Sequence, residues 1–106
     1  MSLTKKERDT LENHNFRVHK FSDGYVELEQ WTNGGVDMII TFDSKTDTPL
    51  VALTDYLKGF DIDEEIDVYR QDEQYRNAFT HEQSVADFKE WQDTIQDTID
   101  SLKKIK

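Results

Sequence analysis

The C-terminal run from Ser84 to Lys106 constrains the fold most, because its side chains divide between two opposite faces of one helix. Apolar positions recur at steps of three and four residues, and acidic positions do the same out of phase with them. At about 100° per residue, the two sets point about 180° apart. The apolar set is Phe88, Trp91, Ile95, Ile99 and Leu102, and the acidic set is Asp87, Glu90, Asp93, Asp97 and Asp100. One face must be buried, and the other presents a line of negative charge.

The composition predicts one folded domain over residues 1–106. Leu, Ile, Val and Phe make up about a quarter of the chain, above the level of roughly a fifth below which disorder is common. A chain of 106 residues with a single proline is long enough for one modest hydrophobic core and too short for two.

The charge and the cysteine count exclude several classes of function. A formal net charge of −10 argues against nucleic acid, an anionic membrane or a phosphate-rich ligand as a direct partner, and it permits a basic partner. Cysteine is absent, so no disulfide, thiolate metal site or thiol nucleophile is expected. No stretch approaches the about 18–20 apolar residues that span a bilayer, and no secretory h-region follows the N-terminal charges. We therefore expect a cytoplasmic protein.

Turn residues divide the first part of the chain into a short helix and three strands. The helix is expected over Leu3 to about Asn13, and it needs tertiary support because it is mostly charged. The last strand is apolar almost throughout, so we expect it in the middle of the sheet or covered by helices on one side. The strands are expected over Phe16–Phe21, Tyr25–Trp31 and Val36–Phe42, with turns at Ser22–Gly24 and Asn33–Gly35.

Three helices are expected after the strands. Thr48-Pro49 suits an N-cap followed by proline at the first helical position, and Gly59 suits the C-cap of that helix. Asp63 is the expected cap of the next helix, and Ser84 with Asp87 three residues later suits the start of the last one. The prediction is an α+β domain in the order α-β-β-β-α-α-α, with a three-stranded antiparallel sheet packed against helices.

The run Asp61-Ile62-Asp63-Glu64-Glu65 resembles the opening of a calcium-binding EF-hand loop. Such a loop needs glycine at its sixth position and a bidentate glutamate at its twelfth, but these positions hold Ile66 and Asp72. We interpret the run as a solvated acidic helix start, with weak divalent binding as the alternative. The three histidines, His14, His19 and His81, have no zinc-site spacing. No metal and no cofactor are expected.

Motifs for catalysis are missing from the sequence. There is no phosphate-cradling glycine loop and no Gly-x-Ser-x-Gly elbow. Carboxylates are so abundant that a pair at a catalytic separation carries no information. We therefore predict that the protein is not an enzyme.

The acidic face of the last helix is the best candidate for a functional surface. Its carboxylates recur about every 4–5 Å along the axis, close to the about 3.4 Å between phosphates of one DNA strand. A second dense acidic region precedes it and would supply a parallel row. The predicted partner-binding residues are Asp61, Asp63, Glu64, Glu65, Asp67, Asp87, Glu90, Asp93, Asp97 and Asp100. The alternative is that these residues form an ordinary solvated face.

Two stretches and the last helix resemble a known group of proteins. The stretches are Glu27-Leu28-Glu29-Gln30-Trp31-Thr32, followed by Gly35 and Asp37, and Phe60-Asp61-Ile62-Asp63-Glu64. Over Tyr25 to Leu102 the chain resembles small acidic proteins of unassigned function from bacterial plasmids, prophages and other mobile elements. It departs from them at Ile62, where proline is common, and at Asn33-Gly34 in the turn. The resemblance implies a mobile-element context and no particular catalytic or binding residues.

Two hypotheses of function follow from the sequence. The preferred one is a non-enzymatic acidic interaction module that binds a basic protein, such as a nucleic-acid-binding protein, by imitating nucleic-acid charge. The alternative is a small homo-oligomeric structural protein, for example a dimer, that pairs through the apolar side of its C-terminal helix. The sequence does not decide whether Trp31 belongs to the core or to a contact surface.

Overall fold

Within residues 3–105, three strands form a single antiparallel sheet, and helices precede and follow it, as the sequence predicts. The computed structural model describes residues 3–105. The chain order is α-β-β-β followed by helices, with one short helix more than predicted. The elements are α1 Lys5–Asn13, β1 Arg17–Lys20, β2 Tyr25–Trp31, β3 Asp37–Asp43, α2 Pro49–Gly59, α3 Ile62–Tyr69, α4 Glu73–Ala78 and α5 His81–Lys103.

The sheet is a meander with β2 in the middle. Leu28 lies opposite Val18 of β1 and Ile40 of β3. β3 is therefore an edge strand and not the middle strand of the sheet. The other prediction for it, that helices cover one of its sides, is correct. Its side chains alternate between the core and solvent, so Ile40 is 5% exposed and Ile39 is 48% exposed.

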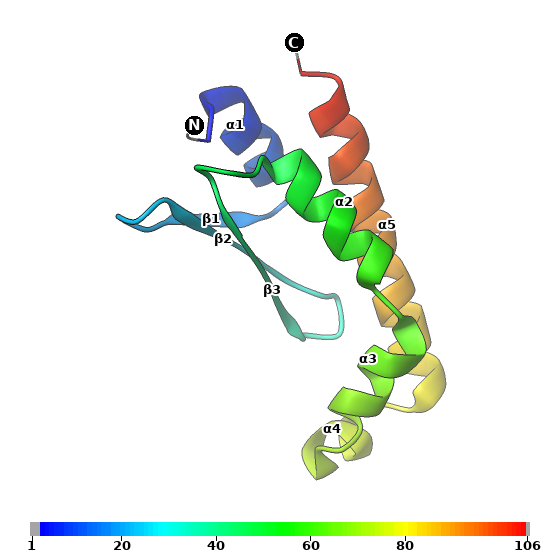
Figure 1. The fold of residues 1–106 in the computed structure, drawn as a ribbon. Helices are drawn as coiled ribbons and strands as arrows, with labels where there is room; N and C mark the ends of the chain where they lie inside the picture. Colours follow the sequence, from blue (N-terminus) through cyan, green and yellow to red (C-terminus); the bar gives the residue numbers. More distant parts are fainter. Residues whose placement is uncertain (1–2, 106) are drawn as a thin grey trace.

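The helices cover one face of the sheet and leave the other open (Figure 1). α5 contacts α1, α2 and α3, while α1 contacts β1 and α2 contacts β3. The buried apolar residues form a single core cluster between the sheet and the helices. α3 and α4 lie beyond the end of the sheet, so the molecule is elongated, with extents of 43 × 28 × 21 Å (Figure 1).

The apolar side of α5 is the centre of this core. The ring centroids of Phe88 and Phe60 lie 6.2 Å apart, and the Trp91 indole N–H donates to the Tyr56 hydroxyl at 3.0 Å. None of the five apolar side chains of this side is more than 5% exposed. These side chains are therefore used in the core of the chain itself and are not exposed on its surface.

Two predicted N-caps and one predicted C-cap differ from the structure. The C-cap of α2 is Phe60 rather than Gly59. α5 begins four residues early, because Thr80 and Gln83 form a capping box, and Ser84 instead lies buried with its hydroxyl 2.9 Å from that of Tyr75. α3 is capped by Asp61 rather than Asp63. The additional helix α4 fills the stretch where the sequence pattern loosens, and it is six residues long.

Candidate interaction surface

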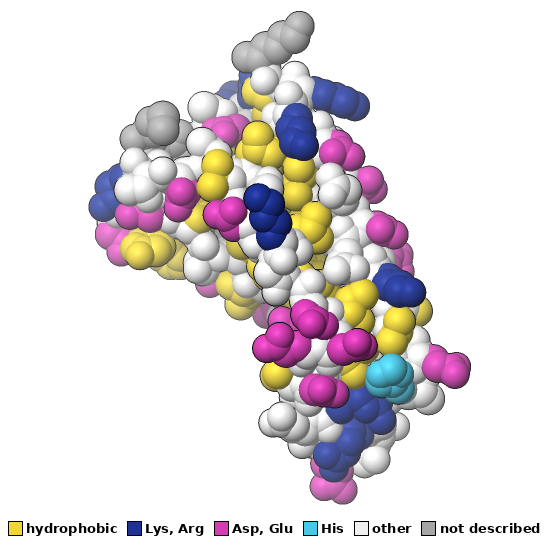
Figure 2. All heavy atoms as spheres, turned by 45° about the vertical axis from the view of Figure 1, so that its right-hand side comes forward, with side chains coloured by type: hydrophobic (Ala, Val, Ile, Leu, Met, Phe, Trp, Pro, Cys, Tyr) yellow, Lys and Arg dark blue, Asp and Glu magenta, His cyan; other side chains and the backbone are white. Residues whose placement is uncertain are grey.

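The outer side of α5 carries the acidic line that the sequence predicts, with one member missing. Glu90, Asp93, Asp97 and Asp100 are exposed, and we call them the acidic row. Their spacing keeps them on one side of the helix over about 15 Å, with a carboxylate about every 5 Å. Figure 2 shows Asp and Glu side chains following one another along this helix.

Asp87 is the missing member, and the structure corrects its predicted role. It is 9% exposed, because the turn between β2 and β3 covers it. Its carboxylate accepts hydrogen bonds from the Thr32 hydroxyl at 2.7 Å and from the Gly34 backbone N–H at 2.8 Å. The Thr32 hydroxyl in turn accepts from the Val36 N–H at 3.1 Å. Asp87 therefore holds the turn against α5 and does not face a partner.

Glu90 lies beside the same turn. Its carboxylate accepts a hydrogen bond from the side-chain amide of Asn33 and remains exposed. The acidic row therefore begins where the sheet meets α5.

The second acidic group surrounds the start of α3. Asp61 caps this helix, accepting from the N–H groups of Asp63 at 3.0 Å and Glu64 at 3.3 Å. Glu65 is half-buried, and burial, followed by the charge of Glu64, raises the pKa of its carboxyl. The other four residues of this group are exposed, namely Asp61, Asp63, Glu64 and Asp67. We call these five residues the α3 cluster, and Figure 2 shows acidic side chains gathered over α3.

The ion pairs of the described residues lie outside both groups. They join Lys5 to Asp9 at 3.2 Å, Arg8 to Glu12 at 3.4 Å and His19 to Glu29 at 3.3 Å. Within residues 3–105, no Lys or Arg nitrogen thus lies within 4.0 Å of a carboxylate of the acidic row or the α3 cluster. Solvent and salt are left to screen these charges.

The acidic row and the α3 cluster are separate groups. α3 contacts α5. In Figure 2, however, hydrophobic side chains are exposed between the acidic side chains over α3 and those along α5. The two groups do not form the pair of parallel rows that the sequence suggests.

Metal-ligand groups do not gather in the described part of the chain. Residues 3–105 contain no group of three or more His, Cys, Asp or Glu side chains that could hold a metal ion. His14 lies 2.9 Å from the Ser101 hydroxyl, and His19 pairs with Glu29. His81 is exposed at the start of α5.

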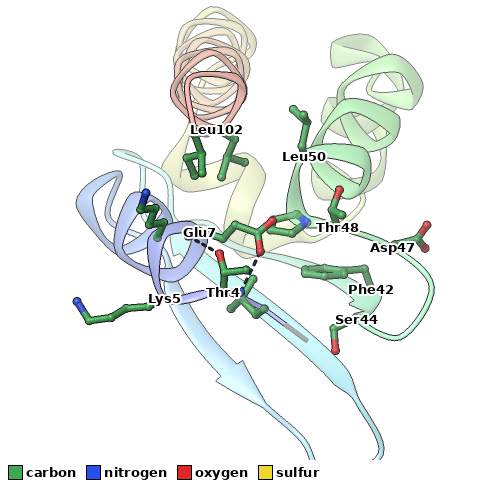
Figure 3. Close-up of a pocket in the computed structure, with 13 residues that line it drawn as sticks. Thr4, Lys5, Glu7, Phe42, Ser44, Asp47, Thr48, Leu50 and Leu102 are labelled. Carbon is green, nitrogen blue, oxygen red and sulfur yellow. Dashed lines mark hydrogen bonds between the residues drawn. The ribbon is translucent and has the colours of Figure 1, made fainter. Parts of the chain in front are cut away.

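A cavity of about 560 Å³ lies among the starts of α1 and α2 and the ends of β3 and α5 (Figure 3). Leu50 and Leu102 reach it from above and Phe42 from the sheet, whereas Lys5 points away. Its central polar groups already pair with each other, because the Thr4 N–H donates to Glu7 at 2.9 Å and the Glu7 N–H to Thr4 at 3.1 Å. The cavity is large enough for a small molecule and offers it mainly apolar contacts.

Trp31 is a surface residue that the sequence left undecided. It is 55% exposed on the open face of the sheet, where Ile39 of β3 is 48% exposed. Successive side chains of β2 alternate between the two faces of the sheet. Val26 and Leu28 point to the core, so the odd-numbered residues, Trp31 among them, point to solvent.

No protein-family model, curated protein or solved structure matches the chain. No residue role can therefore be transferred from a relative, and the surface has to be interpreted from its own chemistry. Among the residues that the structure describes, no helix is long and apolar enough to cross a membrane.

Proposed function

We propose that this protein acts by binding a basic surface of another protein through its acidic row and α3 cluster. The observation that carries the proposal is that these carboxylates, all exposed except the half-buried Glu65, have no Lys or Arg nitrogen within 4.0 Å in the described chain. Exposed helices of soluble proteins usually mix both signs of charge. Between Glu90 and Asp100, α5 carries no Lys or Arg, and Lys89 lies at the edge of the acidic row. Such a predominantly acidic surface is favourable where a partner supplies the opposite charges.

The chemistry of the surface suggests the class of partner. Carboxylates about 5 Å apart along α5 approach the about 3.4 Å phosphate spacing of one nucleic-acid strand. We therefore propose a nucleic-acid-binding protein as the partner, with the acidic surface standing in for phosphates. The net charge of −10 would speed the encounter and make it dependent on salt.

The biological setting is part of the same proposal. The resemblance to small acidic proteins of mobile elements supports a role against a host or rival protein. We propose a cytoplasmic location, which the absence of cysteine permits without favouring it.

Affinity capture with a salt gradient tests the proposal. The immobilised protein is incubated with an extract of its native host, and bound proteins are eluted with rising NaCl and identified by mass spectrometry. The row variant Asp93→Asn/Asp97→Asn/Asp100→Asn is compared with the wild type. We expect basic proteins to elute from the wild type as salt rises, and at lower salt from the row variant, because fewer charge pairs hold them.

A matched control removes the same number of charges elsewhere. Asp9→Asn/Glu12→Gln/Asp47→Asn changes exposed residues outside α3 and α5. Elution from this control should follow the wild type. Equally early elution from both variants would mean that net charge, and not the acidic row, holds the partner. Equal elution from all three proteins would mean that neither does. Either result would contradict the proposal.

A further inference from the structure

The open face of the sheet is a second surface without a partner in the described chain. Every helix that contacts the sheet lies on its other face (Figure 1). Three of the exposed large hydrophobic residues, Tyr25, Trp31 and Ile39, point outward here and are 49%, 55% and 48% exposed. Exposed apolar groups gathered on one face of a monomer are typical of interaction sites.

Four side chains form the centre of this face. Trp31 lies opposite Asp37 and Glu29 lies opposite Ile39 in the β2–β3 ladder. The two apolar side chains are therefore diagonal neighbours across the strands, and so are the two carboxylates. We call Glu29, Trp31, Asp37 and Ile39 the sheet patch.

The two carboxylates of the sheet patch are close enough to affect each other. A hydrogen bond with Asp37, followed by one with His19, lowers the pKa of Glu29. Loss of hydration, followed by the same hydrogen bond with Glu29, raises the pKa of Asp37. A cation placed between two such carboxylates relieves their repulsion, and a planar guanidinium can bond to both while stacking on an indole.

The charge balance of the whole face favours a basic occupant over a second copy. The face carries four carboxylates, from Glu27, Glu29, Asp37 and Asp43, against the guanidinium of Arg17 and the imidazole of His19. Two copies face to face would bring eight carboxylates together. Like charges in contact oppose association, so the complementary surface is a cationic one.

The dimensions of the face favour a short segment. Seven-residue strands are about 23 Å long, and three strands span about 10–15 Å, which gives a few hundred Å². A standard protein interface buries about 800 Å² on each partner. A single extended strand or helical turn of a partner fits this area, whereas a whole domain would extend beyond it.

We propose that the sheet patch binds a short, arginine-bearing segment of a partner protein, with Trp31 as the apolar anchor and Glu29 and Asp37 as acceptors of the guanidinium. The site is distinct from the acidic row and the α3 cluster, and it does not depend on the function proposed for them. Binding through Trp31 follows the general enrichment of tryptophan and arginine among residues that dominate interface energies.

Titration with a defined peptide tests this inference. The probe is a seven-residue peptide of alternating arginine and leucine, and the reference peptide has citrulline, a neutral analogue, in place of arginine. Binding is measured by calorimetry and by amide chemical shifts in NMR spectra of the full chain. We expect the largest shifts at the sheet patch and an about tenfold or greater loss of affinity with citrulline, because the guanidinium contacts are removed.

Variants separate the sheet patch from the acidic helices. Trp31→Ala and Glu29→Gln/Asp37→Asn should each weaken binding of the arginine peptide about tenfold or more, because they remove the anchor or the acceptors. Val68→Ala, at a 58% exposed hydrophobic residue of α3, is the matched control and should have no effect. The row variant Asp93→Asn/Asp97→Asn/Asp100→Asn should change affinity less than about threefold, as expected for distant charges.

Several outcomes would overturn the inference. Undetectable binding, equal binding of the citrulline peptide, or unchanged affinity of both sheet-patch variants would each contradict it. Shifts confined to α3 and α5 would assign peptide binding to the acidic helices alone. Concentration-dependent dimerisation that Trp31→Ala abolishes would show that a second copy covers the face.

Discussion

At the scale of single residues, Asp87 shows how one position of a regular pattern can take a different role. It continues the acidic spacing of α5, yet it lies about 80° from the centre of the apolar set and about 100° from the centre of the exposed carboxylates. Its partners Thr32 and Gly34 lie 55 and 53 residues earlier in the chain. The angular position of Asp87 on the helix lies at the boundary of the core. Its burial is decided by the contact with the turn between β2 and β3.

Asp87→Ala should destabilise the fold. The variant leaves the Thr32 hydroxyl and the Gly34 N–H without their charged acceptor, so we expect the free energy of unfolding to fall by about 2–3 kcal/mol. Asp97→Ala, on the exposed side of the same helix, should change it by less than about 0.5 kcal/mol. Urea unfolding of both variants measures the difference, and equal values would show that the turn does not depend on Asp87.

Gly34→Ala should be destabilising only while Asp87 is present. A Cβ at Gly34 would lie 2.6 Å from Oδ2 and 3.0 Å from Cγ of Asp87, so the carboxylate would have to give up its hydrogen bonds. We expect a loss of more than about 1 kcal/mol in the wild type, and a neutral or stabilising effect in Asp87→Ala, since alanine restricts the unfolded chain. A double-mutant cycle in urea gives the coupling. Additive effects would rule out the contact.

The raised pKa of Tyr56 predicts that the protein loses stability at high pH. Burial raises the pKa of Tyr56 to about 12, although the hydrogen bond from Trp91 opposes this rise. Between the usual tyrosine pKa of about 10 and this value, the unfolded chain loses the phenolic proton while the folded chain keeps it. The free energy of unfolding therefore falls as pH rises through this range. Urea unfolding from pH 9 to 11.5 should show a smaller fall in Tyr56→Phe, and parallel curves would contradict the assignment.

At the scale of elements, the sequence predicted the kinds of helices and strands better than their ends. Both corrected helix starts involve several candidate caps within a few residues, such as Thr80 and Ser84. The pattern does not show which one the tertiary structure leaves at the surface. Ser84 is buried against Tyr75, so it cannot serve as an exposed cap. The six-residue α4 was missed because so short a helix has too few turns for a periodic pattern.

Thr80→Ala should therefore weaken α5 at its start. The Thr80 hydroxyl accepts from the Gln83 N–H at 3.1 Å, and removal of such a cap costs about 1 kcal/mol. Thr94→Ala is the control, because Thr94 lies within α5 and has no capping role. Hydrogen exchange of the first-turn amides of α5 should increase only in the Thr80 variant. Unchanged exchange there would place the start of α5 elsewhere.

β3 illustrates what a short apolar run leaves open. Its residues from Met38 to Phe42 suit a central strand or a half-covered edge equally well. The structure selects the edge because β1 and β3 both pair with β2. Which strands pair depends on contacts between distant parts of the chain, and the periodicity within one strand carries no information about them.

At the scale of the whole molecule, the fold class followed from the sequence and the shape of the candidate surface did not. The amphipathic C-terminal run, the two tight turns and the Thr48-Pro49 helix start each specify local structure. Together they restrict the chain to a small sheet with helices on it. The separation of the acidic row from the α3 cluster depends on the path of α3 beyond the sheet. The open sheet face depends on which side the helices cover, and local patterns leave both undetermined.

The most direct test of the central claim is the salt dependence of binding to a basic partner obtained by affinity capture. Dissociation constants are measured from about 50 to 500 mM NaCl for the wild type, for Asp93→Asn/Asp97→Asn/Asp100→Asn and for Asp9→Asn/Glu12→Gln/Asp47→Asn. If the acidic row contacts the partner, affinity falls steeply with salt in the wild type and in the control, and the slope is clearly smaller in the row variant. Equal slopes for all three proteins would contradict the claim.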